Sequence, residues 1–193
     1  VLAKEGKFLE SAKIYNYLID KGKYNHFTFH RLAGIYERLG KKKEAFECLQ
    51  KAISLKKNYA EAYCDIGRYL LDSNNLKSAL NYFAKALEYK PNLLGAYINI
   101  GNIYQKSGNL VEAMKYFKKS LKINNNIPIT FYNIGTIYLI EKNFLDAEKN
   151  YKKALICDKN FNLAKSGLLE IYLNTFNIKS LKKLKNYIDN AGL

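Results

Sequence analysis

The sequence repeats itself with a period of 34 residues, and this repeat constrains the fold more than any other feature of the chain. Shifting the sequence by 34 positions aligns four consecutive blocks without a gap, at residues 26–59, 60–93, 94–127 and 128–161. A period of about 20–50 residues is typical of chains in which one supersecondary unit is stacked many times. The sequence therefore predicts a repeat protein rather than a fold around one central core.

Each block carries a fixed pattern of small and large residues. Apolar residues recur at helical spacing in two runs, which are separated by a turn such as Ser107-Gly108-Asn109. Small residues where two helices cross let the backbones approach, and large residues fill the space beside them. Each block is therefore predicted to be a hairpin of two helices, A and B, and stacked hairpins give an all-α solenoid. The small positions are Ala33, Gly67, Gly101 and Gly135; Ala45, Ala79, Ala113 and Ala147; and Ala52, Ala86, Ser120 and Ala154; the large positions are Phe29, Tyr63, Tyr97 and Phe131; Leu32, Ile66, Ile100 and Ile134; and Leu49, Phe83, Phe117 and Tyr151.

This pattern, with Pro91 near the end of the second block, resembles the tetratricopeptide repeat family over residues 26–161. The resemblance implies a right-handed solenoid whose A helices line a concave surface and whose B helices form the convex one. The same frame extends weakly in both directions. Residues 1–25 are predicted to be the last part of a hairpin. Residues 162–193, where Lys165 replaces the aromatic residue, are predicted to be a degenerate hairpin that caps the solenoid or leads into a further domain. We thus expect residues 1–193 to form one solenoid.

The chain is strongly basic, with 32 Lys and Arg residues against 17 Asp and Glu residues and a net charge of +15. Such a charge suggests acidic partners, such as nucleic acid or an anionic membrane surface. The charges nearly cancel along the predicted A helices, whereas the lysine runs fall on B helices and their turns. Readers of nucleic-acid sequence are usually richer in arginine, for its bidentate geometry, and this chain has only Arg31, Arg38 and Arg68. We predict a solvated lysine face and no sequence-specific binding of nucleic acid.

The resemblance implies that the A helices bind extended peptides. Asn99 and Asn133 are equivalent in the third and fourth blocks, and this pair resembles the asparagine ladder of repeat regions attached to sugar-transferring enzymes and of some motor-adaptor proteins. Their amides donate and accept hydrogen bonds together, which suits a peptide backbone of any sequence. The alternative is that Leu139 and Ile140 pack on the next repeat and the asparagines reflect composition. The predicted peptide-binding groove comprises Arg68, Ile98, Asn99, Asn102, Gln105, Ile129, Tyr132, Asn133, Thr136 and Leu139.

No arrangement of residues in the sequence predicts catalysis, a metal site or a cofactor. His26 and His30 are four residues apart and Cys64 is equivalent to His30, but no HExxH motif or paired cysteines supply further zinc ligands. Cys48, Cys64 and Cys157 are widely spaced, as expected of reduced thiols. The family's carboxylate clamp for chaperone C-termini is also missing, because its cationic positions are not filled.

The sequence therefore predicts an interaction scaffold that binds an extended peptide or a partner protein, and not an enzyme. One alternative is a substrate-recruiting region of a larger glycosyltransferase, methyltransferase or sulfotransferase, because the sequence opens at Val1 within a hairpin and is expected to be part of a longer protein. Another is non-specific binding of polyanions or membrane surfaces by the convex lysines, which salt would abolish. With no apolar run of membrane-spanning length and no signal-peptide pattern, we expect a cytoplasmic monomer.

Overall fold

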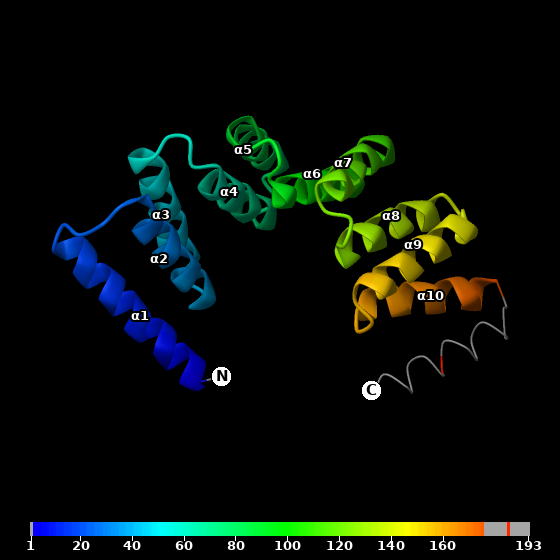
Figure 1. Ribbon diagram of the computed structural model, residues 1–193, viewed down its shortest axis with the longest axis horizontal. Coiled ribbons are helices and arrows are strands. Elements are labelled where there is room, and N and C mark those ends of the chain that lie inside the picture. The colour runs from blue at the N-terminus through cyan, green and yellow to red at the C-terminus, as the bar shows by residue number, and fades with distance from the viewer. Residues whose placement is uncertain (1, 176–184, 186–193) are drawn as a thin grey trace. The chain divides into compact units, whose positions relative to one another are not determined.

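The computed structural model describes residues 2–175 and 185, and within these residues the chain forms ten α-helices and no strand (Figure 1). The chain divides into two compact units, Val1–Ala96 and Tyr97–Leu193, which are described separately below. The all-α prediction is confirmed. The helices are α1 (Leu2–Asp20), α2 (His26–Arg38), α3 (Lys42–Leu55), α4 (Ala60–Asp72), α5 (Leu76–Tyr89), α6 (Leu94–Lys106), α7 (Leu110–Ile123), α8 (Pro128–Ile140), α9 (Phe144–Cys157) and α10 (Asn162–Asn174).

Each predicted block is a helix hairpin. The A helices of the four blocks are α2, α4, α6 and α8, and each is followed by its B helix, α3, α5, α7 or α9 (Figure 1). Within the first unit α2 packs on α3 and α4 on α5, and within the second unit α8 packs on α9. The A helix α10 follows and contacts both α9 and α8. Apart from residue 185, the part of the predicted last hairpin that follows residue 175 lies outside the described residues.

The small and large positions meet where the A and B helices of a hairpin cross. A Cβ atom added to Gly101 would lie 2.5 Å from Cε1 of Phe117, and one added to Gly67 would lie 2.7 Å from the same atom of Phe83. Both rings are fully buried, so the absence of a glycine side chain is what admits them. In the first repeat Ala33 takes the place of the glycine, and the smaller Leu49 takes the place of the ring. The predicted packing of small against large residues is confirmed. It takes two forms in this chain, glycine against an aromatic ring and alanine against leucine.

The turns between the A and B helices place one residue in the left-handed region. Glycine adopts this conformation without steric cost and other residues adopt it rarely. In the first and third repeats the residue is glycine, as the turn favours. In the second and fourth repeats it is not. The four residues and their φ angles are Gly40 (73°), Asn74 (58°), Gly108 (80°) and Lys142 (58°).

The next residue in three of the four turns is an asparagine that caps the following B helix. The side-chain oxygen of Asn75 accepts a hydrogen bond from the backbone N–H of Ser78, and Asn109 and Asn143 do the same in their own repeats. Such caps satisfy a backbone donor that the helix itself leaves unpaired. The first repeat has Lys41 at this place, with a similar backbone conformation and no side-chain cap.

The two terminal helices differ from the repeats between them. In α1, Gly6 lies inside a continuous helix of 19 residues, although it aligns with the turn residues of the later blocks. In α10, Lys165 takes the aromatic position and is buried, with 5% of its surface exposed, and its Nζ atom has no hydrogen-bond partner within the described part of the chain. Among the described residues, the weak extension of the repeat frame therefore corresponds to helix α1 at one end and helix α10 at the other.

Candidate functional site

A hydrogen bond joins two of the predicted asparagines, Asn102 and Asn133, in the second unit. The side-chain Nδ2 of Asn133 on α8 donates a hydrogen bond of 2.8 Å to Oδ1 of Asn102 on α6. Asn133 is 7% exposed, whereas Asn99, Asn102 and Gln105 are half-buried. An amide side chain has two donor hydrogens and two acceptor lone pairs, so one bond leaves each amide able to make more. We refer to Asn99, Asn102, Gln105 and Asn133 as the amide surface.

The apolar residues predicted around these amides divide into two groups. Ile98 on α6 and Ile129 on α8 are half-buried. Tyr132 instead stacks on Tyr151, with ring centroids 5.5 Å apart, and packs with Leu139 against the core formed by α9 and α10. Tyr132 and Leu139 therefore contribute to the fold of the second unit.

Thr136 and Ile140 complete the A-helix face of α8. The Thr136 hydroxyl donates to the backbone oxygen of Tyr132 over 3.0 Å, so its hydrogen is used within the helix. Ile140 is 56% exposed. Binding of a peptide at this face stays a prediction.

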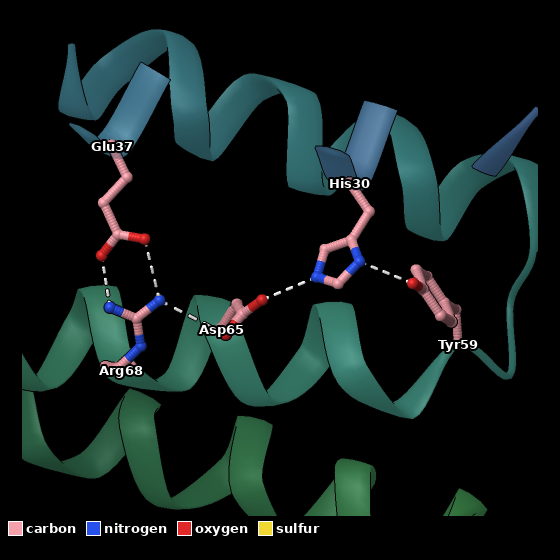
Figure 2. Close-up of polar contacts among 5 residues, drawn as sticks. All are labelled: His30, Glu37, Tyr59, Asp65 and Arg68. Carbon is pink, nitrogen blue, oxygen red and sulfur yellow. Dashed lines mark hydrogen bonds and ion pairs between the residues drawn. The ribbon is translucent and has the colours of Figure 1, made fainter. Parts of the chain in front are cut away.

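Arg68, the remaining predicted groove residue, lies in the first unit on α4, where a chain of polar contacts holds it (Figure 2). Its guanidinium makes a bidentate contact with Glu37 on α2, through Nη1 to Oε1 and through Nη2 to Oε2. Nη2 also lies 3.3 Å from Oδ1 of Asp65, one turn earlier on α4. The hydrogen bond from Arg68 holds the pKa of the Glu37 carboxyl below its ordinary value, so this carboxylate is ionised at neutral pH.

The contacts continue from Asp65 to a histidine and a tyrosine (Figure 2). Nε2 of His30 lies 2.7 Å from Oδ2 of Asp65, and Nδ1 of His30 lies 2.6 Å from the Tyr59 hydroxyl. Burial raises the pKa of Tyr59 to about 12, so its hydroxyl keeps its proton and can donate to Nδ1. In the neutral imidazole this leaves the Nε2 hydrogen to donate to Asp65. We refer to Tyr59, His30, Asp65, Arg68 and Glu37 as the polar network.

The polar network forms part of the wall of a cavity of about 640 Å³ in the first unit. Helix α1 contributes Phe8, Ser11 and Tyr15 to the lining. The aromatic rings and the charged groups together make a hollow with both apolar and ionic walls. The residues that line it are Phe8, Ser11, Tyr15, Phe27, His30, Arg31, Ala33, Gly34, Ile35, Glu37, Arg38, Lys42, Ala45, Phe46, Leu49, Tyr59, Asp65, Arg68, Tyr69 and Asp72.

Sequence reasoning did not find the polar network. His30, Asp65 and Arg68 fall on the A helices of the first two blocks, where His30 was considered as a metal ligand and Arg68 as a groove residue. Complementary charges at such positions in consecutive blocks were the available signal. Their pairing follows from the packing of α2 beside α4, which the 34-residue period alone does not describe.

The residues considered for metal or thiol chemistry have other roles. Both ring nitrogens of His30 lie within hydrogen-bond distance of protein groups, and the described part of the chain holds no group of three or more His, Cys, Asp or Glu residues that could bind a metal ion. Burial raises the pKa of the Cys64 thiol to about 12 and that of Cys48 to about 11. These thiols are protonated at neutral pH and are poor nucleophiles.

Comparison with known families gives three matches along the chain. Models described as tetratricopeptide repeat match residues 24–92, 95–127 and 130–155. No curated protein matches the sequence. Among the described residues, no helix is both long enough and apolar enough to cross a bilayer.

Solved structures with this fold are numerous and distant in sequence. A crystal structure of MamA is 24% identical over 81% of this chain and 92% of its own, with a TM-score of 0.69. PilF of Pseudomonas aeruginosa is 14% identical over 98% of this chain and 86% of its own, with a TM-score of 0.81. A chain of the APC/C hetero-tetramer Cut9–Hcn1 is 20% identical over 88% of this chain and 34% of its own, with a TM-score of 0.75. These likenesses establish the fold and leave the ligand to be argued from the residues.

Proposed function

Because this chain belongs to the tetratricopeptide repeat family, we propose that it is a protein-interaction scaffold that binds an extended segment of a partner protein on the amide surface of α6 and α8. Stacked repeats present long rigid surfaces, and protein binding is their usual role. One structural neighbour is itself a chain of a hetero-tetramer, Cut9–Hcn1. The proposed role for this chain is assembly rather than chemistry.

The observation that carries the proposal is the hydrogen bond between Asn102 and Asn133, because it joins neighbouring A helices through two amides. The bond fixes the orientation of both side chains, so a peptide that binds them would find their remaining donors and acceptors already in place. Such preorganisation lowers the entropy that binding costs. Asn99 and Gln105 lie one turn before and one turn after Asn102 on the same helix face.

The peptide backbone is the expected ligand of these amides. An extended segment exposes N–H and C=O groups that a paired donor and acceptor can satisfy without regard to sequence. Ile98 and Ile129, half-buried beside the amides, would contact apolar side chains of the segment. The proposal therefore predicts broad sequence tolerance with a preference for apolar residues.

The test is a peptide-array screen at physiological salt, followed by titration of the peptides it selects. The variant Asn99→Ala with Gln105→Ala removes two amides for which no side-chain hydrogen bond is found in the described structure. A matched control is Asn81→Ala with Gln50→Ala, which removes one asparagine and one glutamine that are exposed on the B helices α5 and α3. Removal of two weak amide contacts should cost about 1 kcal/mol of binding free energy, so we expect the first variant to bind at least about fivefold more weakly. The control should bind like the parent.

Two outcomes would argue for the other functions considered. Binding of any polyanion with a steep salt dependence, unchanged in the amide variant, would favour the lysine-rich B helices as the binding surface. Selection of peptides from one enzyme's substrates only would favour a substrate-recruiting role. Failure of the parent to bind any array peptide would refute the proposal.

A further inference from the structure

The arginines of this chain are confined to one place. The sequence has 32 Lys and Arg residues, of which only Arg31, Arg38 and Arg68 are arginines, and all three line the cavity of the first unit. The lining contains one lysine, Lys42. Guanidinium groups bind carboxylates through two parallel hydrogen bonds, whereas an ammonium is a compact and strongly hydrated charge. The cavity can therefore bind carboxylates through paired hydrogen bonds, which the lysine side chains elsewhere on the chain cannot form.

Arg68 is already engaged and serves as part of the wall. Glu37 and Asp65 both contact its guanidinium, and Asp65 is itself held by His30. This arrangement fixes the α4 side of the cavity before any ligand arrives.

Arg31 and Arg38 are different, because neither forms an ion pair within the described part of the chain. Arg31 is exposed, and Arg38 is exposed with its guanidinium 5.4 Å from the ring centroid of Phe8. Stacking on an aromatic ring orients a guanidinium and leaves its hydrogen-bonding edge available. Two cationic groups on α2 thus line the cavity without forming an ion pair with the carboxylates that also line it, Glu37, Asp65 and Asp72.

The backbone between these two arginines is open. Arg31, Gly34 and Arg38 are spaced so that they share one face of α2, and seven residues of helix separate the two arginine Cα atoms by about 10 Å. Gly34 is exposed, and a Cβ atom added to it would meet nothing within 4 Å. A ligand can therefore lie against the helix between the two guanidinium groups.

Apolar surface lies beside the charged face. Phe27 is 53% exposed, and it lines the cavity with Phe8 and Tyr15. Phe8 and Tyr15 are half-buried. Aromatic rings beside arginines that form no ion pair suit a ligand that combines carboxylates with an apolar side chain.

We propose that the cavity of the first unit binds an extended acidic peptide segment. Two carboxylates of the segment pair with Arg31 and Arg38, its backbone crosses Gly34, and an apolar side chain between the carboxylates packs on the aromatic residues that α1 contributes to the cavity, Phe8 and Tyr15. In an extended chain, residues two to four positions apart are separated by about 7–13 Å, which brackets the spacing of the two arginines. This site is separate from the amide surface, and the inference does not depend on peptide binding there.

The probes are fluorescein-labelled nonapeptides that carry two glutamates, spaced by two, three or four positions around a phenylalanine. Matched peptides carry glutamine in place of each glutamate. Fluorescence anisotropy at physiological salt reports binding to the full chain. We expect the parent to bind at least one glutamate peptide, and to bind its glutamine counterpart at least roughly tenfold more weakly, as loss of two charge-assisted contacts implies.

Three variants locate the site. Arg31→Gln with Arg38→Gln removes both guanidinium groups that form no ion pair and should weaken binding of the glutamate peptide at least roughly tenfold. Gly34→Gln places a side chain on the open backbone between the two arginines without a clash at its Cβ atom and should weaken binding of the same peptide similarly. Lys51→Gln with Lys77→Gln is the charge-matched control, because both lysines are exposed in the same unit outside the cavity lining, and it should bind like the parent.

Circular dichroism establishes that every variant keeps the parent's helicity. The proposal is overturned if no glutamate peptide binds the parent, if glutamine peptides bind equally well, or if the lysine control loses as much affinity as the arginine variant. Binding of an oligonucleotide at the arginines in preference to every glutamate peptide would also overturn it. The amide variant Asn99→Ala with Gln105→Ala should leave acidic-peptide binding unchanged, so failure at one site is distinguished from failure at the other.

Discussion

Gly101 has no room for a side chain, so its replacement by alanine should strain the core of the second unit. An ideal Cβ atom there lies 2.5 Å from Cε1 of Phe117, and ordinary van der Waals contact begins at 3.4 Å. The ring would have to move by about 0.9 Å, the difference between these distances. Phe117 is fully buried, so it cannot move without displacing other core groups. Overpacking of this kind costs about 1–3 kcal/mol.

A second glycine supplies the control. Alanine lowers the entropy that a helix position loses on folding, which stabilises by about 0.5–1 kcal/mol relative to glycine. Gly34→Ala gains this term without a clash, because nothing lies within 4 Å of its Cβ position, and should stabilise the protein. Gly101→Ala gains the same entropic stabilisation but also forces the new Cβ atom against Phe117. The difference between the two changes in the free energy of unfolding therefore isolates the packing cost, which we expect to be about 1–3 kcal/mol.

The first repeat shows how the clash can be relieved. It combines Ala33 with Leu49 where the third repeat combines Gly101 with Phe117. Adding Phe117→Leu to Gly101→Ala should therefore recover stability, and the double variant should be more stable than the sum of the two single effects by about 0.5–3 kcal/mol. Urea unfolding followed by circular dichroism measures the parent and the four variants. Equal effects of alanine at the two glycines, or strict additivity in the double variant, would refute the packing argument.

Three further changes test the caps, turns and charges. Lys41→Asn should raise the unfolding free energy by about 0.5–1 kcal/mol, because Lys41 has nearly the backbone angles of the capping Asn75; an unchanged melting temperature would contradict this. Lys142→Gly should stabilise by up to about 1 kcal/mol, since Lys142 has a φ of 58°; thermal melting measures it, and a lower midpoint would count against strain there. Glu37→Gln should destabilise the protein most at neutral pH and least near pH 3. Arg68 holds the pKa of Glu37 below its ordinary value in the folded protein. The ionised carboxylate therefore adds stability at pH values above its ordinary pKa, and this stability is lost as the pH falls through the folded pKa. With both side chains nearly half exposed, the effect should stay below about 1 kcal/mol, and a parent–variant difference that grows on acidification would refute it.

The architecture could be predicted because it depends on contacts within each hairpin, and the same residue pattern recurs in each repeat. The glycine at position 101 and the phenylalanine at position 117 recur with the same spacing in the second repeat, as Gly67 and Phe83. A contact within one hairpin follows directly from that spacing, since the geometry of the hairpin is the same each time. The all-α fold and the packing of small against large residues were accordingly confirmed.

The polar contacts between hairpins could not be predicted in the same way. His30 and Asp65 are 35 residues apart, and whether they touch depends on the rotation of α2 against α4 and on side-chain rotamers that the period does not fix. The same limit applies to Asn133, which the sequence presents as one rung of a ladder and the structure places in a nearly buried hydrogen bond with Asn102. The cavity was missed for a further reason, because a hollow is defined by residues from several helices at once.

We propose that the A-helix face of α6 and α8 binds an extended peptide. Isoleucine δ1-methyl NMR provides the test, because Ile98 and Ile129 each lie one helical turn before an amide of this surface, Asn102 or Asn133, and Ile156 is 81% exposed on the B helix α9. On titration with an array-selected peptide, we expect saturable shifts at Ile98 and Ile129 and none at Ile156. Shifts at Ile156 with Ile98 and Ile129 unmoved would contradict it.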